Sequence, residues 1–223
     1  MKKIVITGTS QGIGLELAKI LAESHRVIGI SRKAPLKTAK QNFTTIPCDM
    51  STSEFASDLA KKIKHELGRI DILINNAGFL VNKPLSKLTQ AETAQMFAVN
   101  VLGLIECTRN LLPLMKEGAH IVNIGSMGGF QGSLKYPGLS VYSSTKAAVA
   151  GFTEALAVEL SGTGISVNCL ALGAVNTKML QRAFPDYKAS TSAREMANFI
   201  ADFALKGNKF FNGKILPVAQ SNP

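Results

Sequence analysis

Short apolar runs alternate along the chain with segments of helical periodicity. Residues 3–7 (KIVIT) form a β-branched apolar run, whereas residues 13–23 repeat apolar side chains at helical spacing. The same patterns predict further strands at 26–30, 43–47, 70–75, 120–125, 165–170 and 210–218. They predict further helices at 52–67, 90–112, 143–160 and 191–205. Ser51, with Glu54 three residues on, is a candidate cap for the first of these helices.

This alternation predicts an α/β fold with a parallel sheet covered on both faces, because strands buried on both faces read as continuous apolar runs. About seven such strands predict a doubly wound, Rossmann-type sheet over a single domain, 1–223. Residues 126–140 are dense in glycine and proline and follow a strand, which makes them a candidate active-site loop. The less regular residues 176–190 are a candidate lid.

Composition excludes several classes of protein. Hydrophobic residues make up 46% of the chain, which excludes disorder. No apolar run approaches the roughly 18 residues of a membrane span, and the first run ends at Thr7, too early for a signal peptide. We therefore expect a cytoplasmic protein with no membrane partner. Cys48, Cys107 and Cys169 lie far apart and we expect them to be core thiols, with no metal site.

The charge is one-sided, with 25 basic against 15 acidic residues. The lysines are spread along the chain, and there is no arginine-rich tract or aromatic–basic interleaving. We therefore expect no nucleic-acid partner. A basic surface, part of which serves an anionic small molecule, accounts for the excess.

The first predicted strand runs into the glycine-rich turn T-G-T-S-Q-G-I-G at 7–14, which opens the first helix. Gly8 permits the tight turn, Gly12 lets the backbone approach a pyrophosphate, and Gly14 lets the helix lie close to the sheet. The free N–H groups at the helix start would face the phosphates. An ordinary glycine-rich turn is the alternative. The dinucleotide site would comprise Gly8, Ser10, Gln11, Gly12, Ile13 and Gly14.

The end of the second strand favours NADP over NAD. An NAD enzyme usually holds the ribose 2′-hydroxyl with an acidic residue there, but no acid occurs from 24 to 48. Arg32 and Ser31 offer a guanidinium and a hydroxyl, which suit a 2′-phosphate. Lys33 is a weaker candidate, and solvated loop cations are the alternative. Gln11 supplies no second cation from the glycine loop.

Tyr142 and Lys146 lie four residues apart in Y-S-S-T-K and share one face of a predicted helix. A tyrosine has a pKa of about 10, and a nearby ammonium lowers it. The pair could pass a proton to or from a carbonyl oxygen, although a surface pair is the alternative. Tyr136 has Ser140 four residues on and lacks the lysine, so it is no acid–base candidate.

These motifs resemble those of the short-chain dehydrogenase/reductase family. The glycine loop is followed in order by N-N-A-G at 75–78, Asn100 in V-N-V-L-G, Ser126 after a strand, and Tyr142-x-x-x-Lys146. The resemblance covers residues 3 to about 218 and looks like the compact single-domain branch. It implies a NAD(P)-dependent oxidoreductase acting on a small-molecule alcohol or carbonyl compound.

The resemblance also implies a catalytic set. Tyr142 would be the general acid in reduction, and Lys146 would lower its pKa and hold the nicotinamide ribose. Ser126 would stabilise the substrate oxygen, and Asn100 would hold a water that links Lys146 to solvent. For Ser126 and Asn100 the alternatives are a loop serine and an amide tied to backbone.

Further cofactor residues follow from the resemblance. Asp49 would meet the adenine amino group, with Met50 beside it. The others would shape the adenosine side of the pocket or contact the nicotinamide: Asn76, Ala77, Gly78, Gly173, Val175 and Thr177.

The chain departs from the family pattern at three places. Ser126 and Tyr142 are 16 positions apart, a longer gap than usual, and the extra residues lie beside the substrate. Leu172 stands where the family usually has proline, so local rigidity is lost. The segment 178–192 is short and the tail after Val218 lacks a glycine pair, which suggests an open site for a bulky or tethered substrate.

The sequence thus predicts an NADP-dependent oxidoreductase, with a 3-oxoacyl thioester as the leading substrate by family analogy. The basic face could meet an acidic acyl carrier. A non-catalytic dinucleotide sensor is the alternative, although such a protein need not keep all four catalytic residues. The resemblance also implies a homodimer or homotetramer, and small residues on the helices at 90–112 and 143–160 suit close packing.

Overall fold

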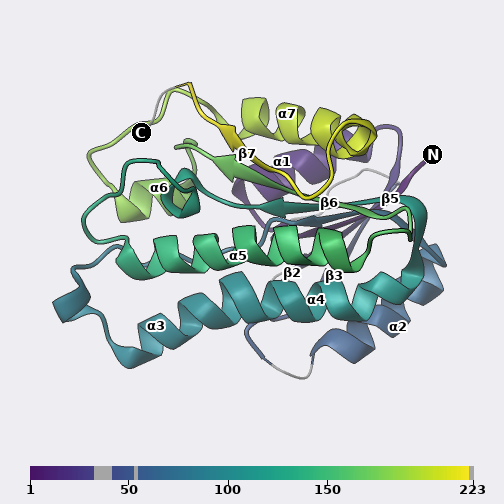
Figure 1. Cartoon of the computed structure of the whole chain (residues 1–223), viewed down its shortest axis with the longest axis horizontal. Coiled ribbons are helices and arrows are strands. Elements are labelled where there is room, and N and C mark those ends of the chain that lie inside the picture. The colour runs from purple at the N-terminus through teal and green to yellow at the C-terminus, as the bar shows by residue number, and fades with distance from the viewer. Residues whose placement is uncertain (33–41, 53–54, 221–223) are drawn as a thin grey trace.

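The computed structural model describes residues 1–32, 42–52 and 55–220. Its centre is one parallel sheet in the order β3-β2-β1-β4-β5-β6-β7 (Figure 1). This confirms the predicted Rossmann-type fold. The strands are β1 Lys3–Thr7, β2 Arg26–Ser31, β3 Phe43–Pro47, β4 Ile70–Asn75, β5 Met115–Ile124, β6 Ser166–Leu172 and β7 Ile215–Val218.

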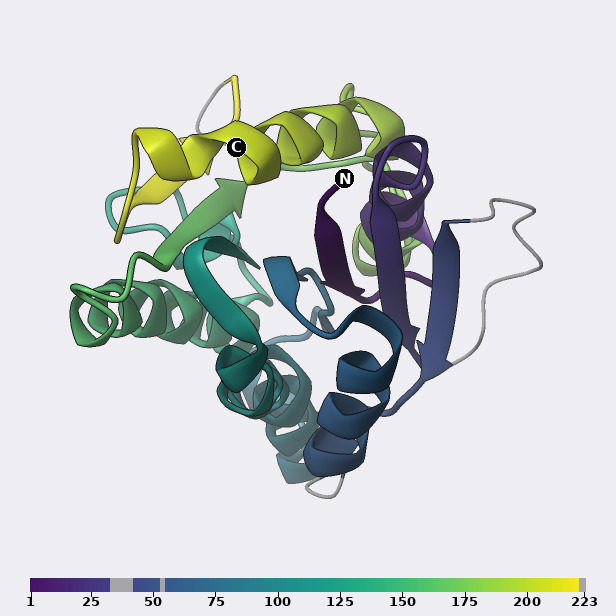
Figure 2. The same ribbon diagram turned by 90° about the vertical axis from the view of Figure 1, so that its right-hand side faces the viewer.

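Helices cover both faces of the sheet (Figure 2). On one face lie α1 (Gly12–Leu21) and α7 (Ala193–Lys206), which pack on each other. On the other lie α2 (Phe55–Leu67), α4 (Gly103–Leu111) and α5 (Ser140–Glu159). Two short helices, α3 (Gln90–Phe97) and α6 (Lys178–Ala183), lie in the connections after β4 and β6. None of the described helices combines the length and apolar composition that a bilayer crossing needs.

The core has two halves because side chains alternate across each strand. Ile4 and Ile6 of β1 belong to the half beneath α1 and α7, whereas Val5 belongs to the half beneath α2 and α4. All three side chains are fully buried. The near-continuous apolar strands of the sequence therefore reflect a sheet with no solvent-facing side.

Several predicted boundaries differ from the structure. The strand expected at 120–125 begins at Met115. The one expected at 210–218 is reduced to Ile215–Val218, because residues 210–214 follow a turn and bend in which Gly213 has a φ of +68°. The candidate lid at 176–190 contains the ordered helix α6. The Ser51 hydroxyl donates to Asp49 Oδ1 at 2.7 Å. The capping box predicted from Ser51 and Glu54 stays a prediction, because residues 53–54 lie outside the described residues.

The helix predicted at 90–112 is interrupted by a wide π-turn, Ala98–Leu102, between α3 and α4. Such turns insert one residue into the helical repeat and are frequent at functional sites. Asn100 lies in the middle of this turn and is buried. Asn100 is thus distinguished by its place in a π-turn as well as by its buried amide group.

His120 is buried on β5 and links this strand to β6 and α7. Its Nδ1 lies 3.0 Å from the carbonyl oxygen of Ala204, and its Nε2 lies 3.0 Å from Asn168 Nδ2. The amide of Asn168 also donates to the carbonyl of Phe211, so Nε2 accepts and Nδ1 donates in the neutral ring. Burial lowers the pKa of His120 to about 4. The folded protein therefore holds this histidine neutral at ordinary pH.

The buried histidine predicts an acid-sensitive fold. The pKa of His120 falls from 6.5 in the unfolded chain to about 4 in the folded protein, so only the unfolded chain takes up this proton between these values. Stability should be full above pH 6.5 and fall by roughly 3 kcal/mol as pH drops to 4. Urea unfolding across this range measures the slope.

His120→Gln should flatten that slope by about one proton, and the same change at the exposed His65 should not. Equal slopes for wild type and His120→Gln would contradict a neutral His120.

Candidate active site

A cavity of about 680 Å³ opens at the carboxyl ends of the strands, where the connections after β1, β4, β5 and β6 meet. Every residue that the sequence predicts for catalysis or cofactor binding lines this cavity, with the exception of Asn100. Sequence segments from Gly8 to Thr177 are thus brought to one place.

The glycine loop has the geometry of a phosphate cradle. Gly8 adopts a φ of +78°, which side chains rarely allow, and a Cβ on Gly14 would lie 2.3 Å from the carbonyl oxygen of Gly8. Helix α1 starts after the extended residue Gln11, without a side-chain cap among the described residues and without an acid in its first turn. Its N–H groups and dipole therefore suit an anionic pyrophosphate.

Asn76 and Thr7 join this loop to the end of β4. Thr7 Oγ1 accepts hydrogen bonds from the backbone N–H groups of Asn76 and Ala77, at 3.0 and 2.9 Å. The amide of Asn76 donates to the carbonyl oxygens of Thr7 and Gly8, at 2.9 and 3.2 Å. Asn76 therefore braces the loop, and its neighbours Ala77 and Gly78 line the cavity.

The ends of β2 and β3 form the adenosine side of the cavity. Ser31 is buried and Arg32 is exposed at its margin. Asp49 accepts hydrogen bonds from the backbone and side chain of Ser51, which hold its pKa below the usual range, and the Arg32 charge adds to this shift. Lys33, Lys37 and Lys40 lie outside the described residues. Arg32 is thus a described cation at this margin of the cavity.

Lys146 is buried on α5 and points to the end of β5. Its Nζ donates to the carbonyl oxygen of Ile124 at 2.8 Å and lies 5.9 Å from the centre of the Tyr142 ring. Burial lowers the pKa of Lys146 to about 8. The pair predicted from Y-x-x-x-K is therefore a buried lysine beside a half-buried tyrosine that lines the cavity, and not a surface pair.

The pKa of Tyr142 differs from the sequence expectation. Burial raises the pKa of Tyr142 to about 12, and a hydrogen bond with Ser126 opposes the rise only in part. The expected lowering by Lys146 is absent because its ammonium donates to the carbonyl oxygen of Ile124 and lies 5.9 Å from the centre of the Tyr142 ring. Tyr142 is therefore a neutral phenol that can donate a proton.

Ser126 is held beside Tyr142 by a short helical turn, Met127–Gly129, that packs on α5. The hydroxyl oxygen of Ser126 accepts from the N–H of Gly128 at 3.1 Å. A Cβ on Gly129 would lie 2.4 Å from the backbone of Lys146, so glycine is needed for this packing. The hydroxyl hydrogen of Ser126 can then turn toward an oxygen in the cavity.

Asn100 lies behind the cavity and not in its lining. Its Oδ1 accepts from the N–H of Phe79 at 2.7 Å, while its Nδ2 donates to the carbonyl of Phe79 at 2.8 Å and to Thr145 Oγ1 at 3.0 Å. The side chain is thus tied to backbone, which was the alternative role. It braces the segment after β4 against α5.

Sequence reasoning missed most of the wall opposite the cofactor residues. Tyr136, excluded above as an acid–base residue, lines the cavity. No local motif marks these positions, although several fall in the two loops that the sequence predicts as active-site loop and lid. The missed wall is largely apolar: Leu80, Val99, Met127, Tyr136, Leu139, Met179, Leu180, Phe184 and Tyr187.

Comparisons with known proteins agree with this geometry. A family model described as short chain dehydrogenase matches residues 2–188. The chain is 35% identical over 186 residues to the ketoacyl reductase HetN of Nostoc sp., covering 78% of this chain and 64% of HetN. It is 32% identical over 192 residues to the 3-oxoacyl-[acyl-carrier-protein] reductase FabG of Chlamydia muridarum, covering 80% of this chain and 75% of FabG.

Solved structures share the whole fold. A short chain dehydrogenase of Burkholderia cenocepacia in complex with NADP has a TM-score of 0.86 at 25% identity, covering 99% of this chain and 97% of the other. The NADP-bound structure of ElxO has a TM-score of 0.84 at 28% identity, with 98% and 97% covered.

The cradle geometry makes Gly14 a sharp test of nucleotide binding. Gly14→Ala would push the loop away from α1, because the added carbon has no room beside the Gly8 carbonyl. We expect at least a tenfold loss of NADPH affinity, which is about 1.4 kcal/mol, measured by calorimetry. Gly151→Ala, in a helix with open space around the new methyl, is the matched control. Unchanged affinity in Gly14→Ala would place the nucleotide elsewhere.

Proposed function

The chain belongs to the short-chain dehydrogenase/reductase family, and we propose that it transfers a hydride between NADPH and a carbonyl or alcohol substrate. The observation that carries this proposal is the convergence of Tyr142, Lys146 and Ser126 on the cavity that also holds the glycine loop. A nucleotide-binding protein without catalysis would not need a phenol in the cavity wall beside a buried amine.

The preference for NADP is supported by charge at the adenosine side. Arg32 reaches the cavity margin beside the buried Ser31, and the described part of this side offers Asp49 as its acid, already engaged by Ser51. An arginine fits a phosphate better than a ribose hydroxyl because its planar fork can make paired hydrogen bonds. Two similar solved structures hold NADP, which agrees with this choice.

The substrate that we propose is a 3-oxoacyl thioester. Two relatives are named as ketoacyl or 3-oxoacyl reductases, and the second name specifies an acyl carrier protein. The net charge of +10 would favour an acidic carrier. A carrier-bound substrate would place its carbonyl at Ser126 and Tyr142 and leave its tether toward the cavity mouth.

In the proposed mechanism the nicotinamide cofactor, when bound, supplies or accepts the hydride. Ser126 donates a hydrogen bond to the substrate carbonyl and stabilises the charge that grows on its oxygen. Tyr142, neutral at physiological pH, gives its phenolic proton to that oxygen. Lys146 stabilises the phenolate that remains, and Ile124 orients its ammonium. A water beside Asn100 that links Lys146 to solvent as a proton relay is also part of this proposal.

We also propose that the protein is a homodimer or homotetramer. The apolar side chains of Leu102 and Val158, beside α4 and on α5, are 58% and 77% exposed. Small exposed residues of α5, such as Ala147 and Gly151, would allow close helix packing.

Replacement of Tyr142 by phenylalanine tests the proposed acid. The change removes the proton donor and keeps the ring, so we expect at least a thousandfold loss of turnover with NADPH affinity within twofold of wild type. Oxidation of NADPH with acetoacetyl thioesters, followed by absorbance, measures it. Full activity in Tyr142→Phe would refute this role. Turnover of simple ketones or sugars but not of thioesters would refute the substrate class.

Arg32→Asp tests the cofactor preference. Removing the guanidinium and adding a carboxylate should weaken NADPH binding and favour NADH, so the ratio of their dissociation constants should shift by a hundredfold or more, which is about 2.7 kcal/mol. Calorimetry suits this comparison because the chain has no tryptophan. An unchanged ratio would mean that the 2′-phosphate binds elsewhere. Absence of binding to either cofactor in the wild type would favour a non-catalytic protein.

A further inference from the structure

The wall of the cavity opposite the cofactor residues comes from three segments far apart in the sequence. One follows β4 and contributes Leu80. The second is the long loop between Ser126 and α5, which contributes Met127 and Leu139, and the third is α6, which contributes Met179 and Leu180. Among the described lining residues of these segments, Lys178 is the one charged side chain. Together they form an apolar chamber, defined here by residues 79–83, 126–139 and 177–187.

Asn82 is the point at which these three segments meet. Its side-chain Nδ2 donates at 2.7 Å to the carbonyl oxygen of Ala183, the last residue of α6. Next to it, the backbone N–H of Lys83 donates at 3.1 Å to the carbonyl oxygen of Gly138. A Cβ on Gly138 would lie 1.9 Å from Asn82 Oδ1, so the long loop passes directly over this side chain. Removing the Asn82 side chain therefore takes away the hydrogen bond to α6 and the packing contact with the long loop, while the backbone bond of Lys83 to Gly138 remains.

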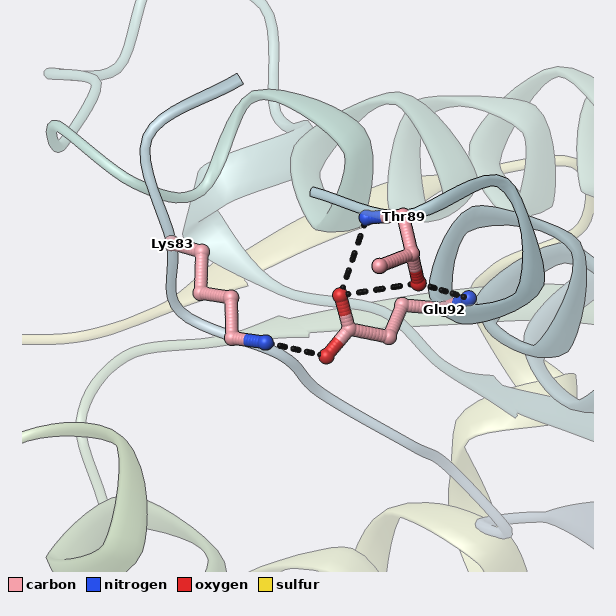
Figure 3. Close-up of polar contacts among 3 residues, drawn as sticks. All are labelled: Lys83, Thr89 and Glu92. Atoms are coloured by element: carbon pink, nitrogen blue, oxygen red, sulfur yellow. Dashed lines mark hydrogen bonds and ion pairs between the residues drawn. The ribbon is translucent and has the colours of Figure 1, made fainter. Parts of the chain in front are cut away.

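The segment that carries Asn82 is itself fixed at both ends. On one side Asn100 holds both backbone groups of Phe79. On the other, the ammonium of Lys83 pairs with Glu92. Figure 3 shows that the same carboxylate also accepts from the backbone and hydroxyl of Thr89, the capping residue of α3. Asn82 thus lies on a fixed segment, and the long loop and α6 are both hydrogen-bonded to that segment.

We propose that Asn82 acts as a clamp that holds the walls of the apolar chamber in place, and that it thereby selects carbonyl substrates with an extended apolar body. The inference rests on the proposed function, because it concerns the substrate side of that same site. A short substrate needs only Ser126 and Tyr142 to hold its carbonyl. A long one also buries its apolar body against the chamber walls, and this contact depends on the walls being held in place. Asn82 is a positioning residue, since it acts through the walls.

The clamp can be tested on the protein without any ligand. In Asn82→Ala, hydrogen–deuterium exchange should rise at least tenfold in residues 178–187, because the hydrogen bond from Asn82 to Ala183 is lost. It should rise less in residues 134–139, which lose their packing against Asn82 but keep the backbone bond from Lys83 to Gly138. Asn82→Asp keeps the size of the side chain, removes the N–H donor and should behave alike. Asn208→Ala is the matched control, since this asparagine also donates to a distant backbone carbonyl, that of Gly118, but lies far from the cavity. Equal exchange in wild type and Asn82→Ala would overturn the clamp.

The substrate side is tested with 3-oxoacyl N-acetylcysteamine thioesters of four and ten acyl carbons. Asn82→Ala should raise KM about tenfold for the long thioester and less than twofold for the short one, with NADPH affinity within twofold of wild type. Gly138→Ala, which places a methyl group against Asn82 Oδ1, should show the same split. An equal rise in KM for both thioesters would overturn the selection of an apolar body.

The exchange measurement separates the two proposals. If the wild type turns over no carbonyl compound, the proposed function fails, and the exchange result alone decides whether the clamp exists. If the wild type is active and the exchange changes but KM does not, the clamp exists without selecting substrate, and the inference fails while the function stands.

Discussion

The separation of two neighbouring strand ends is the constraint on which this site depends. After β1 the chain turns to one face of the sheet, and after β4 it turns to the other, so the backbone groups between them lose their ladder partners. Thr7 and Asn76 supply the missing partners through four hydrogen bonds of 2.9–3.2 Å. These bonds hold the ends of β1 and β4 at a fixed separation. The glycine loop and the proposed catalytic residues Ser126, Tyr142 and Lys146 line the cavity that opens there.

Burial shifts Tyr142 and Lys146, the two groups proposed for proton transfer, toward their neutral forms. It raises the pKa of Tyr142 to about 12 and lowers that of Lys146 to about 8. At neutral pH the phenol therefore keeps its proton, and in the proposed mechanism the Lys146 ammonium would stabilise the phenolate that remains after proton transfer. An anionic dinucleotide beside Lys146 would raise its pKa again and strengthen its hold on the phenolate. Charge stabilisation at this site is therefore coupled to occupancy of the glycine loop.

The sequence predicts the parts of this protein that depend on local chemistry. Strand and helix periodicity predicts the sheet, and the glycine loop, Tyr142 and Lys146 are predicted from residue type and spacing. Ser126 is predicted from the family resemblance. Asn82 could not be predicted, since its partner Ala183 is 101 residues away and neither residue belongs to a pattern. The π-turn at Asn100 also escapes prediction because its sequence is ordinary helix sequence. The missing lysine four residues after Tyr136 excludes it as an acid–base residue. It says nothing about whether Tyr136 lies in the cavity wall.

Leu172 shows how a departure from the family pattern is compensated by packing. Proline would have stiffened the end of β6 but would have removed a backbone N–H there. Leucine keeps that group, pairs with Val218 of β7 and buries its side chain to 6% exposure. The next residue, Gly173, donates to the carbonyl oxygen of Val218 at 3.0 Å, so the ladder continues to the rim of the cavity. Sheet pairing therefore supplies the rigidity at the cofactor side, whereas the substrate side relies on single side-chain contacts such as that of Asn82.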